Sequence, residues 1–97
     1  MNRAAPVNDR FIIVNEHKRE NLVIDPHYIV DRTDDALIIQ VTLNQGRTVD
    51  TKKALYRAIV DGLHERLGLR TEDVVIGLVE VPKENWSFGR GEAQYAA

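Results

Sequence analysis

The sequence predicts an α/β domain with a mostly parallel sheet and one main helix. Two segments, 36–43 and 74–81, have the composition of strands, and the segment 48–67 between them has the periodicity of an amphipathic helix. With 97 residues, the chain has room for a single hydrophobic core. We therefore treat 1–97 as one domain, in which 36–81 forms a βαβ unit with parallel strands and a right-handed crossover.

The first predicted strand, 36–43, is apolar along one whole face, because side chains alternate along a strand. The residues of that face are Leu37, Ile39, Val41 and Leu43. Ala36 and Ile38 are apolar on the other face, so we expect cover on most of both faces. The second strand, 74–81, has Gly77 as its weak point and is ended by Pro82.

The predicted helix has clear signals at both ends. Thr48 is a good N-cap, Asp50 suits the positive end of the helix dipole, and Gly68 suits the C-terminal cap. An apolar side chain recurs at every fourth position, at Leu55, Ile59, Leu63 and Leu67. Beside this stripe, Gly62 is expected to permit close packing on the sheet.

The rest of the chain has weaker signals. Residues 1–9 are small and polar and predict an arm or loop. The apolar run 11–14 suggests a strand, and 15–35 predicts a long loop or a weak hairpin. The C-terminal segment 82–97 is polar but holds three of the six aromatic residues, Trp86, Phe88 and Tyr95.

Composition excludes several classes of function. The net charge of −2 lacks the basic excess of a general nucleic-acid binder, and the absence of cysteine excludes disulfides, thiolate metal sites and a cysteine nucleophile. The three histidines have no metal-ligand spacing, so we expect no metal. No apolar run is long enough to cross a membrane and no signal core is evident, so the expected location is cytoplasmic.

Three features could carry chemistry, although each also has an ordinary explanation. Arg47 lies between a parallel strand and a helix N-terminus, where anions bind, but surface arginines beside turns are common. Asp9 could be a general acid or orient water, or it could be a turn residue in a weak surface ion pair. Trp86 and Phe88 need a surface to bury against: a pocket wall, another part of the chain, or a subunit interface.

Several motifs together resemble the tautomerase superfamily, in particular its malonate semialdehyde decarboxylase-like branch. The resemblance rests on ALIIQVTLNQGRTVDTKKALYRAI, on EDVVIGLVEV and above all on NWSFGRGEAQY. The segment 8–11 resembles a further family motif, so the similarity reaches from about residue 6 to Tyr95. WSFGRG is the specific part, and the other motifs support it.

The resemblance implies a fold of two βαβ units assembled as a trimer, and roles for individual residues. Asp9 would assist proton transfer or orient water, and Arg47 would bind the substrate carboxylate. The pocket wall would be formed by Trp86, Phe88 and Tyr95. Gln45 stands where the decarboxylase has a second arginine, which argues against decarboxylation of the same substrate. No cofactor is implied.

The chain departs from the family at its start. Family members use the amine of an N-terminal proline, whereas residue 2 here is Asn2 and Pro6 is internal, with an amide nitrogen that is not basic. We expect the first strand and helix of the fold to be missing, so that the fold is N-terminally incomplete. One helix cannot cover about three strands, which predicts a homo-oligomer, a partner chain or an upstream segment as cover.

Two functions from different classes follow. In the first, the protein is a cofactor-independent isomerase that moves a proton on a small 2-oxo or 3-oxo carboxylic acid, by enol–keto tautomerisation or by a related hydration or decarboxylation. In the second, it is a non-catalytic relative that binds small anions or completes a mixed oligomer.

Overall fold

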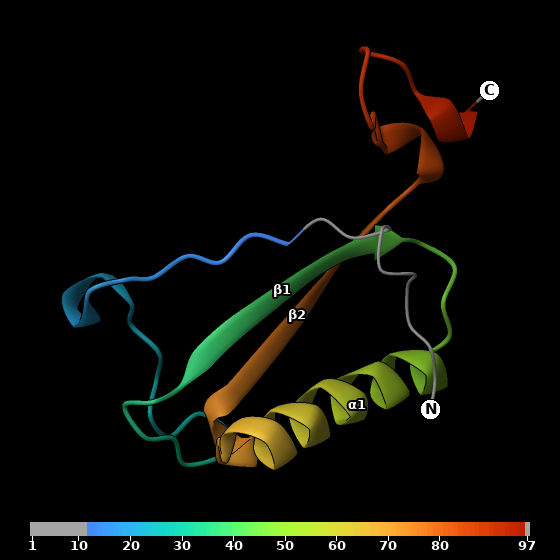
Figure 1. The fold of residues 1–97 in the computed structure, drawn as a ribbon. Helices are drawn as coiled ribbons and strands as arrows, with labels where there is room; N and C mark the ends of the chain where they lie inside the picture. The colour runs from blue at the N-terminus through green and yellow to red at the C-terminus, as the bar shows by residue number, and fades with distance from the viewer. Residues whose placement is uncertain (1–11, 97) are drawn as a thin grey trace.

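The computed structural model describes residues 12–96, which form a two-stranded sheet with one long helix on one face (Figure 1). The strands are β1 (Leu37–Asn44) and β2 (Val74–Val81), and the helix is α1 (Val49–Leu67). Four single 3-10 turns complete the described elements: η1 (Arg19–Asn21), η2 (Thr71–Asp73), η3 (Lys83–Asn85) and η4 (Gln94–Ala96). The predicted α/β class, with parallel strands and one main helix, is confirmed.

The two strands pair in parallel from Leu37 opposite Val74 to Asn44 opposite Val81. Residues paired in this way share a face of the sheet. The predicted apolar row of β1 lies on the face next to α1, since Ile39 lines a groove together with residues of α1, and all four side chains of the row are half-buried. On the opposite face, Ile38 is 53% and Val79 is 41% exposed. We expected both faces of β1 to be covered, but within the described residues only the face next to α1 is covered.

The described residues do not close a hydrophobic core. None of the hydrophobic residues between 12 and 96 is buried, and Asp73, which is 1% exposed, is the one fully buried residue of this range. A helix and two strands have too little apolar surface facing one another to exclude water. The single chain therefore leaves a large share of its apolar surface in contact with solvent.

The helix begins and ends where its cap residues predict. The Thr48 hydroxyl oxygen accepts a hydrogen bond from the Thr51 N–H at 3.2 Å. Gly68 adopts φ +69° and donates its N–H to the His64 carbonyl at 2.9 Å. The expectation for Gly62 is wrong for the chain by itself, because a Cβ added at Gly62 would meet no atom within 4 Å.

The segment before β1 is a loop rather than a hairpin. Residues 12–14 are exposed and form no strand, while Phe11 lies outside the described residues. Between 15 and 35 the described chain has the 3-10 turn η1, a bend at 26–30 and a turn at 34–35. The Arg32 guanidinium ties this bend together by donating to the carbonyls of Asp25 and Tyr28 at 3.0 and 2.7 Å.

Asp73 attaches this loop to the start of β2. Its carboxylate accepts the Thr33 N–H at 2.7 Å and the Thr33 hydroxyl at 2.6 Å, with the Arg70 guanidinium 3.6 Å away. The hydroxyl bond and then the N–H bond lower the pKa of Asp73 against the opposing effect of burial, helped by the charges of Arg70 and Arg32. The folded state therefore favours the ionised, hydrogen-bonded form of the Asp73 carboxylate.

Two glycines of α1 give a matched pair of substitutions. We expect Gly68→Ala to lower the free energy of unfolding by about 1 kcal/mol, because its left-handed backbone disfavours a Cβ. Gly62→Ala should raise it by about 1 kcal/mol, because alanine favours the helix and the space is open. Urea titrations at one fixed protein concentration measure both. Equal effects of the two substitutions would contradict this description.

The Asp73 carboxylate predicts a loss of stability in acid. Because its pKa is lowered by folding, its contribution is complete above its ordinary pKa of about 4 and is lost as the pH falls through the lower value of the folded state. Thermal melts should show this loss in the wild type and a flatter profile in Asp73→Asn. Asp61→Asn, on the exposed face of α1, serves as the control and should keep the wild-type profile.

Candidate functional site

The predicted site residues of the described range gather where both strands end. Because β1 and β2 are parallel, Asn44 and Val81 end at the same edge of the sheet. The Gln45 N–H donates to the Val81 carbonyl at 2.9 Å and extends this pairing by one residue. Gly46, with φ +114°, then turns the chain toward α1. This turn places Arg47 one residue before the helix N-cap.

Arg47 is exposed and folds back on the end of its own strand. Its guanidinium donates to the Asn44 carbonyl at 2.9 Å. That bond uses one of the five N–H groups of the side chain. The bond holds the cation at the end of β1, and Arg47 itself lies one residue before the helix N-cap Thr48, where the positive end of the helix dipole begins. The arrangement favours an anion at this edge of the sheet.

The three C-terminal aromatic residues form one cluster. The rings of Trp86 and Phe88 are stacked, with centroids 5.4 Å apart, and Tyr95 meets Phe88 edge-on at 5.0 Å. The Gln94 amide closes the loop between them, accepting from the Phe88 N–H and donating to the Gly89 carbonyl at 3.0 and 2.9 Å. Within the described residues Trp86 is half-buried, whereas Phe88 is 41% and Tyr95 is 54% exposed, so the cluster does not bury its own rings.

Asn44 connects the aromatic cluster with Arg47. Its side-chain oxygen accepts the indole N–H of Trp86 at 2.7 Å, and its backbone carbonyl accepts the Arg47 guanidinium. Asn44 is not among the site residues that the sequence predicts. The signal available was its place as the last side chain of a parallel strand, directly before the glycine turn, where ligands of α/β sheets bind.

The remaining predicted positions are less informative. Gln45 is exposed at the same turn, next to Asn44. Asp9 lies outside the described residues. The segment 89–91 is a tight turn, as its glycines predict, and it presents Arg90 in a left-handed conformation with φ +61°.

An ion pair crosses from the helix to the sheet close to this edge. The Lys52 ammonium lies 2.7 Å from a carboxylate oxygen of Glu80, and both side chains are more than two-thirds covered. The helical pattern places Lys52 on the outer side of α1, but its long side chain reaches back to β2. The pair ties the first turn of α1 to the C-terminal end of β2, so it helps to fix the edge that carries Arg47.

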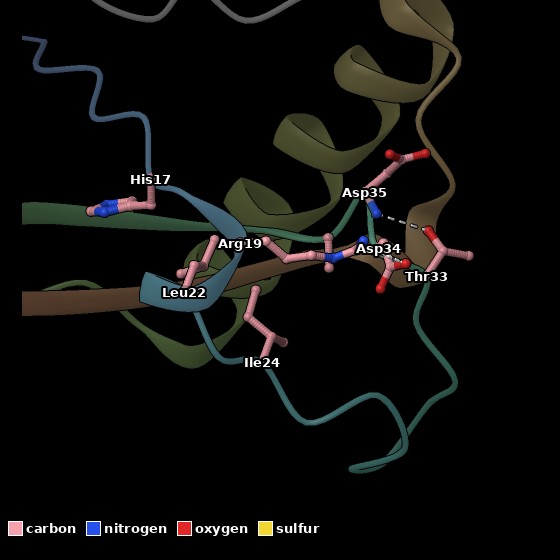
Figure 2. A pocket seen from close by; sticks show the side chains of 8 residues that line it. His17, Arg19, Leu22, Ile24, Thr33, Asp34 and Asp35 are labelled. Atoms are coloured by element: carbon pink, nitrogen blue, oxygen red, sulfur yellow. Dashed lines mark hydrogen bonds and ion pairs between the residues drawn. The ribbon is translucent and has the colours of Figure 1, made fainter.

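Two hollows lie away from this edge. Figure 2 shows the first, about 440 Å³, between η1 and the residues before β1, with Arg19 extended toward Asp34 as its ion-pair partner. It is lined by His17, Arg19, Leu22, Ile24, Thr33, Asp34, Asp35 and Ala36. The second, also about 440 Å³, is an apolar groove lined by Ile39, Ala58, Ile59, Gly62, Leu63, Arg66 and Leu67. Neither includes a residue of the predicted site.

Other kinds of site find no support in residues 12–96. In this range, no three acidic or histidine side chains are grouped closely enough to ligate a metal ion. No helix of the described chain is both long and apolar enough to cross a bilayer. His64, on the polar side of α1, has its Nδ1 at 2.8 Å from the Leu69 carbonyl and serves the C-terminal turn of the helix.

A βαβ unit with an arginine at the strand end and an aromatic C-terminal segment agrees with the family that the motifs indicated. The family model described as "Tautomerase enzyme" matches residues 9–89, so the chain belongs to this tautomerase family. A curated relative, the probable tautomerase YusQ of Bacillus subtilis (strain 168), is 44% identical over 90 residues. That alignment covers 92% of this chain and 71% of YusQ.

Solved structures agree with this assignment. The chain is similar to FG41 malonate semialdehyde decarboxylase inhibited by 3-bromopropiolate, with a TM-score of 0.83 and 34% identity over 95% of this chain and 70% of that one. A malonate semialdehyde decarboxylase studied for its decarboxylase and hydratase activities gives a TM-score of 0.84 and 28% identity. Here 95% of this chain and 71% of the other are covered. The predicted membership of the superfamily is therefore confirmed.

Proposed function

We propose that the protein moves a proton on a small 2-oxo or 3-oxo carboxylic acid, in an enol–keto tautomerisation that needs no cofactor. The observation that carries the proposal is the junction at Asn44, which places a guanidinium and an indole at one end of the sheet. Arg47 binds the carboxylate of the substrate. The aromatic cluster of Trp86, Phe88 and Tyr95 forms an apolar wall, and Gln45 contributes a neutral hydrogen-bonding side chain.

The chemistry requires charge to be stabilised on the substrate. Conversion of an enol to a keto acid places a proton on carbon and removes one from the enol oxygen, through a species with enolate character. A guanidinium on the carboxylate reduces its repulsion with that developing charge, and an apolar wall strengthens the interaction by excluding water. Asp9, which lies outside the described residues, is proposed to assist the proton movement or to orient water.

Tautomerisation suits the site better than decarboxylation does. The decarboxylase that the sequence resembles has a second arginine at the position of Gln45, and a neutral amide holds a carboxylate less strongly than a guanidinium. One cation is sufficient to anchor a monocarboxylate. The structural relative has decarboxylase and hydratase activities, and we regard these as related reactions on the same class of substrate.

A non-catalytic role is the alternative, and one feature of the sequence favours it. Pro6 is internal, so its nitrogen is an amide and supplies neither a base nor a cationic acid. A chain of this kind would bind small anions at Arg47 or complete a mixed oligomer. Turnover of phenylenolpyruvate by the 97-residue chain decides between the two functions, since binding without turnover supports the alternative.

Arg47→Ala tests the carboxylate anchor. We expect the KM for phenylenolpyruvate to rise about 10- to 100-fold, because a hydrogen-bonded pair between charged groups is lost. The matched control is Arg57→Ala, which removes an exposed arginine of α1 that pairs with Asp61 at 3.6 Å and lies away from the strand ends. The ketonisation is monitored by ultraviolet absorbance, which gives kcat and KM for each variant. A KM that is the same in both variants would refute the role of Arg47.

We propose further that the chain forms a homo-oligomer, with a trimer as the expected form. Support comes from the face of the sheet opposite α1, where Ile38 and Val79 are exposed. Sedimentation equilibrium should give a multiple of the chain mass of 11.0 kDa. Ile38→Asp should lower the mass, whereas Val23→Asp, in the exposed loop before β1, should not. A monomeric wild type over the accessible concentrations would refute the oligomer.

A further inference from the structure

The last residue of β1 makes two hydrogen bonds that join both halves of the candidate site. The Asn44 side-chain oxygen lies 2.7 Å from the Trp86 indole nitrogen, and the Asn44 carbonyl oxygen lies 2.9 Å from the Arg47 guanidinium. We propose that Asn44 is a positioning residue, which fixes the aromatic cluster and the carboxylate-binding arginine relative to each other. Its consequence for ligand binding rests on the proposed function, whereas its effect on Trp86 does not.

Asn44 is suited to this role because its own backbone is fixed. It pairs with Val81 at the end of the parallel ladder, and the next N–H along the chain, that of Gln45, also bonds to Val81. Its side chain points to the face away from α1, since it has the same parity as Gln40 and Thr42, which are exposed there. Both of those residues are open to solvent, whereas Asn44 is half-buried under the indole.

The Asn44–Trp86 hydrogen bond helps to position the other two rings of the aromatic cluster as well as the indole. Trp86 directly follows η3 and stacks on Phe88, which in turn meets Tyr95. Contacts within the C-terminal segment, through Gln94 and the turn at 89–91, also help to hold the cluster. In the described chain, the Asn44–Trp86 hydrogen bond is a direct link from this segment back to the sheet over 42 positions of sequence. Loss of this hydrogen bond removes one fixed point of the aromatic cluster relative to the strand end that holds Arg47.

The two bonds of Asn44 can be separated by mutation. The guanidinium binds the backbone carbonyl, which every substitution keeps, whereas the indole binds the side chain. Asn44→Ala therefore removes the anchor of the aromatic cluster and leaves that of Arg47. Asn44→Asp keeps an acceptor oxygen for the indole and adds a negative charge beside Arg47, which opposes the binding of an anion.

Trp86 provides the direct readout, because it is the one tryptophan of the sequence. Its indole N–H gives a single resonance in a ¹⁵N-labelled sample. We expect Asn44→Ala to shift this resonance and to speed its exchange with solvent at least about tenfold, as the loss of a hydrogen bond of ordinary strength implies. Asn44→Asp should keep the slow exchange. Gln40→Ala, which removes an amide from the same face of β1, is the matched control and should leave the resonance unchanged.

The second readout is the affinity for phenylpyruvate, measured by the change in Trp86 fluorescence. Asn44→Ala should weaken binding about tenfold in the wild-type background. In the background of Trp86→Phe, which lacks the N–H donor, the same substitution should have no further effect when binding is followed by calorimetry. An equal effect in both backgrounds would show that Asn44 acts on stability rather than through the indole, and would overturn the proposal.

The readouts also distinguish a failure of this proposal from a failure of the proposed function. An indole resonance that is unchanged by Asn44→Ala overturns the positioning role, whatever the protein binds. A shifted resonance in a protein that neither binds nor turns over the probes upholds the link between Asn44 and Trp86, and refutes the proposed oxo-acid function instead.

Discussion

The parallel pairing of β1 and β2 is the constraint on which the rest of the structure depends. Parallel strands must be joined by a crossover, and here α1 provides it, so both strands end at the same edge. The turn after β1 and the segment after β2 therefore begin side by side, although Asn44 and Val81 are 37 positions apart in the sequence. An antiparallel hairpin of the same strands would send Arg47 and Trp86 to opposite ends of the sheet.

This arrangement leaves apolar surface open on both sides of the layer formed by α1 and the sheet. The face opposite α1 exposes Ile38 and Val79, and the groove between α1 and β1 has open space around Gly62. Polar interactions connect elements that a hydrophobic core would otherwise hold together. Asp73 joins the loop before β1 to the start of β2, and the Lys52–Glu80 ion pair joins α1 to β2. Such bonds are directional, so they fix geometry well, but they contribute less stability than a closed core.

The sequence predicted the regular elements because their signals are local. An apolar face marked the first strand and an apolar composition marked the second, apolar side chains at every fourth position marked α1, and Thr48 and Gly68 marked its ends. The prediction of a strand at 11–14 is wrong for residues 12–14. β-branched residues favour a strand only when a neighbouring strand is available, and residues 12–14 have none in the described chain. Asn44 and Lys52 were missed for a similar reason, since each acts through a partner distant in sequence, Trp86 and Glu80 respectively.

The role of Asn44 also explains how a weak sequence signal can belong to a specific site. An arginine at a turn is common, and so is a tryptophan in a polar C-terminal segment. The combination of Arg47 and Trp86 becomes informative because both bind Asn44, whose backbone is fixed by the sheet. The bond from Arg47 to the carbonyl orients the guanidinium and leaves its other N–H groups for a ligand, while the bond from Trp86 brings an apolar surface to the same strand end. Asn44 thus links a guanidinium and an indole to one strand end, although the residues that carry them lie 39 positions apart in the sequence.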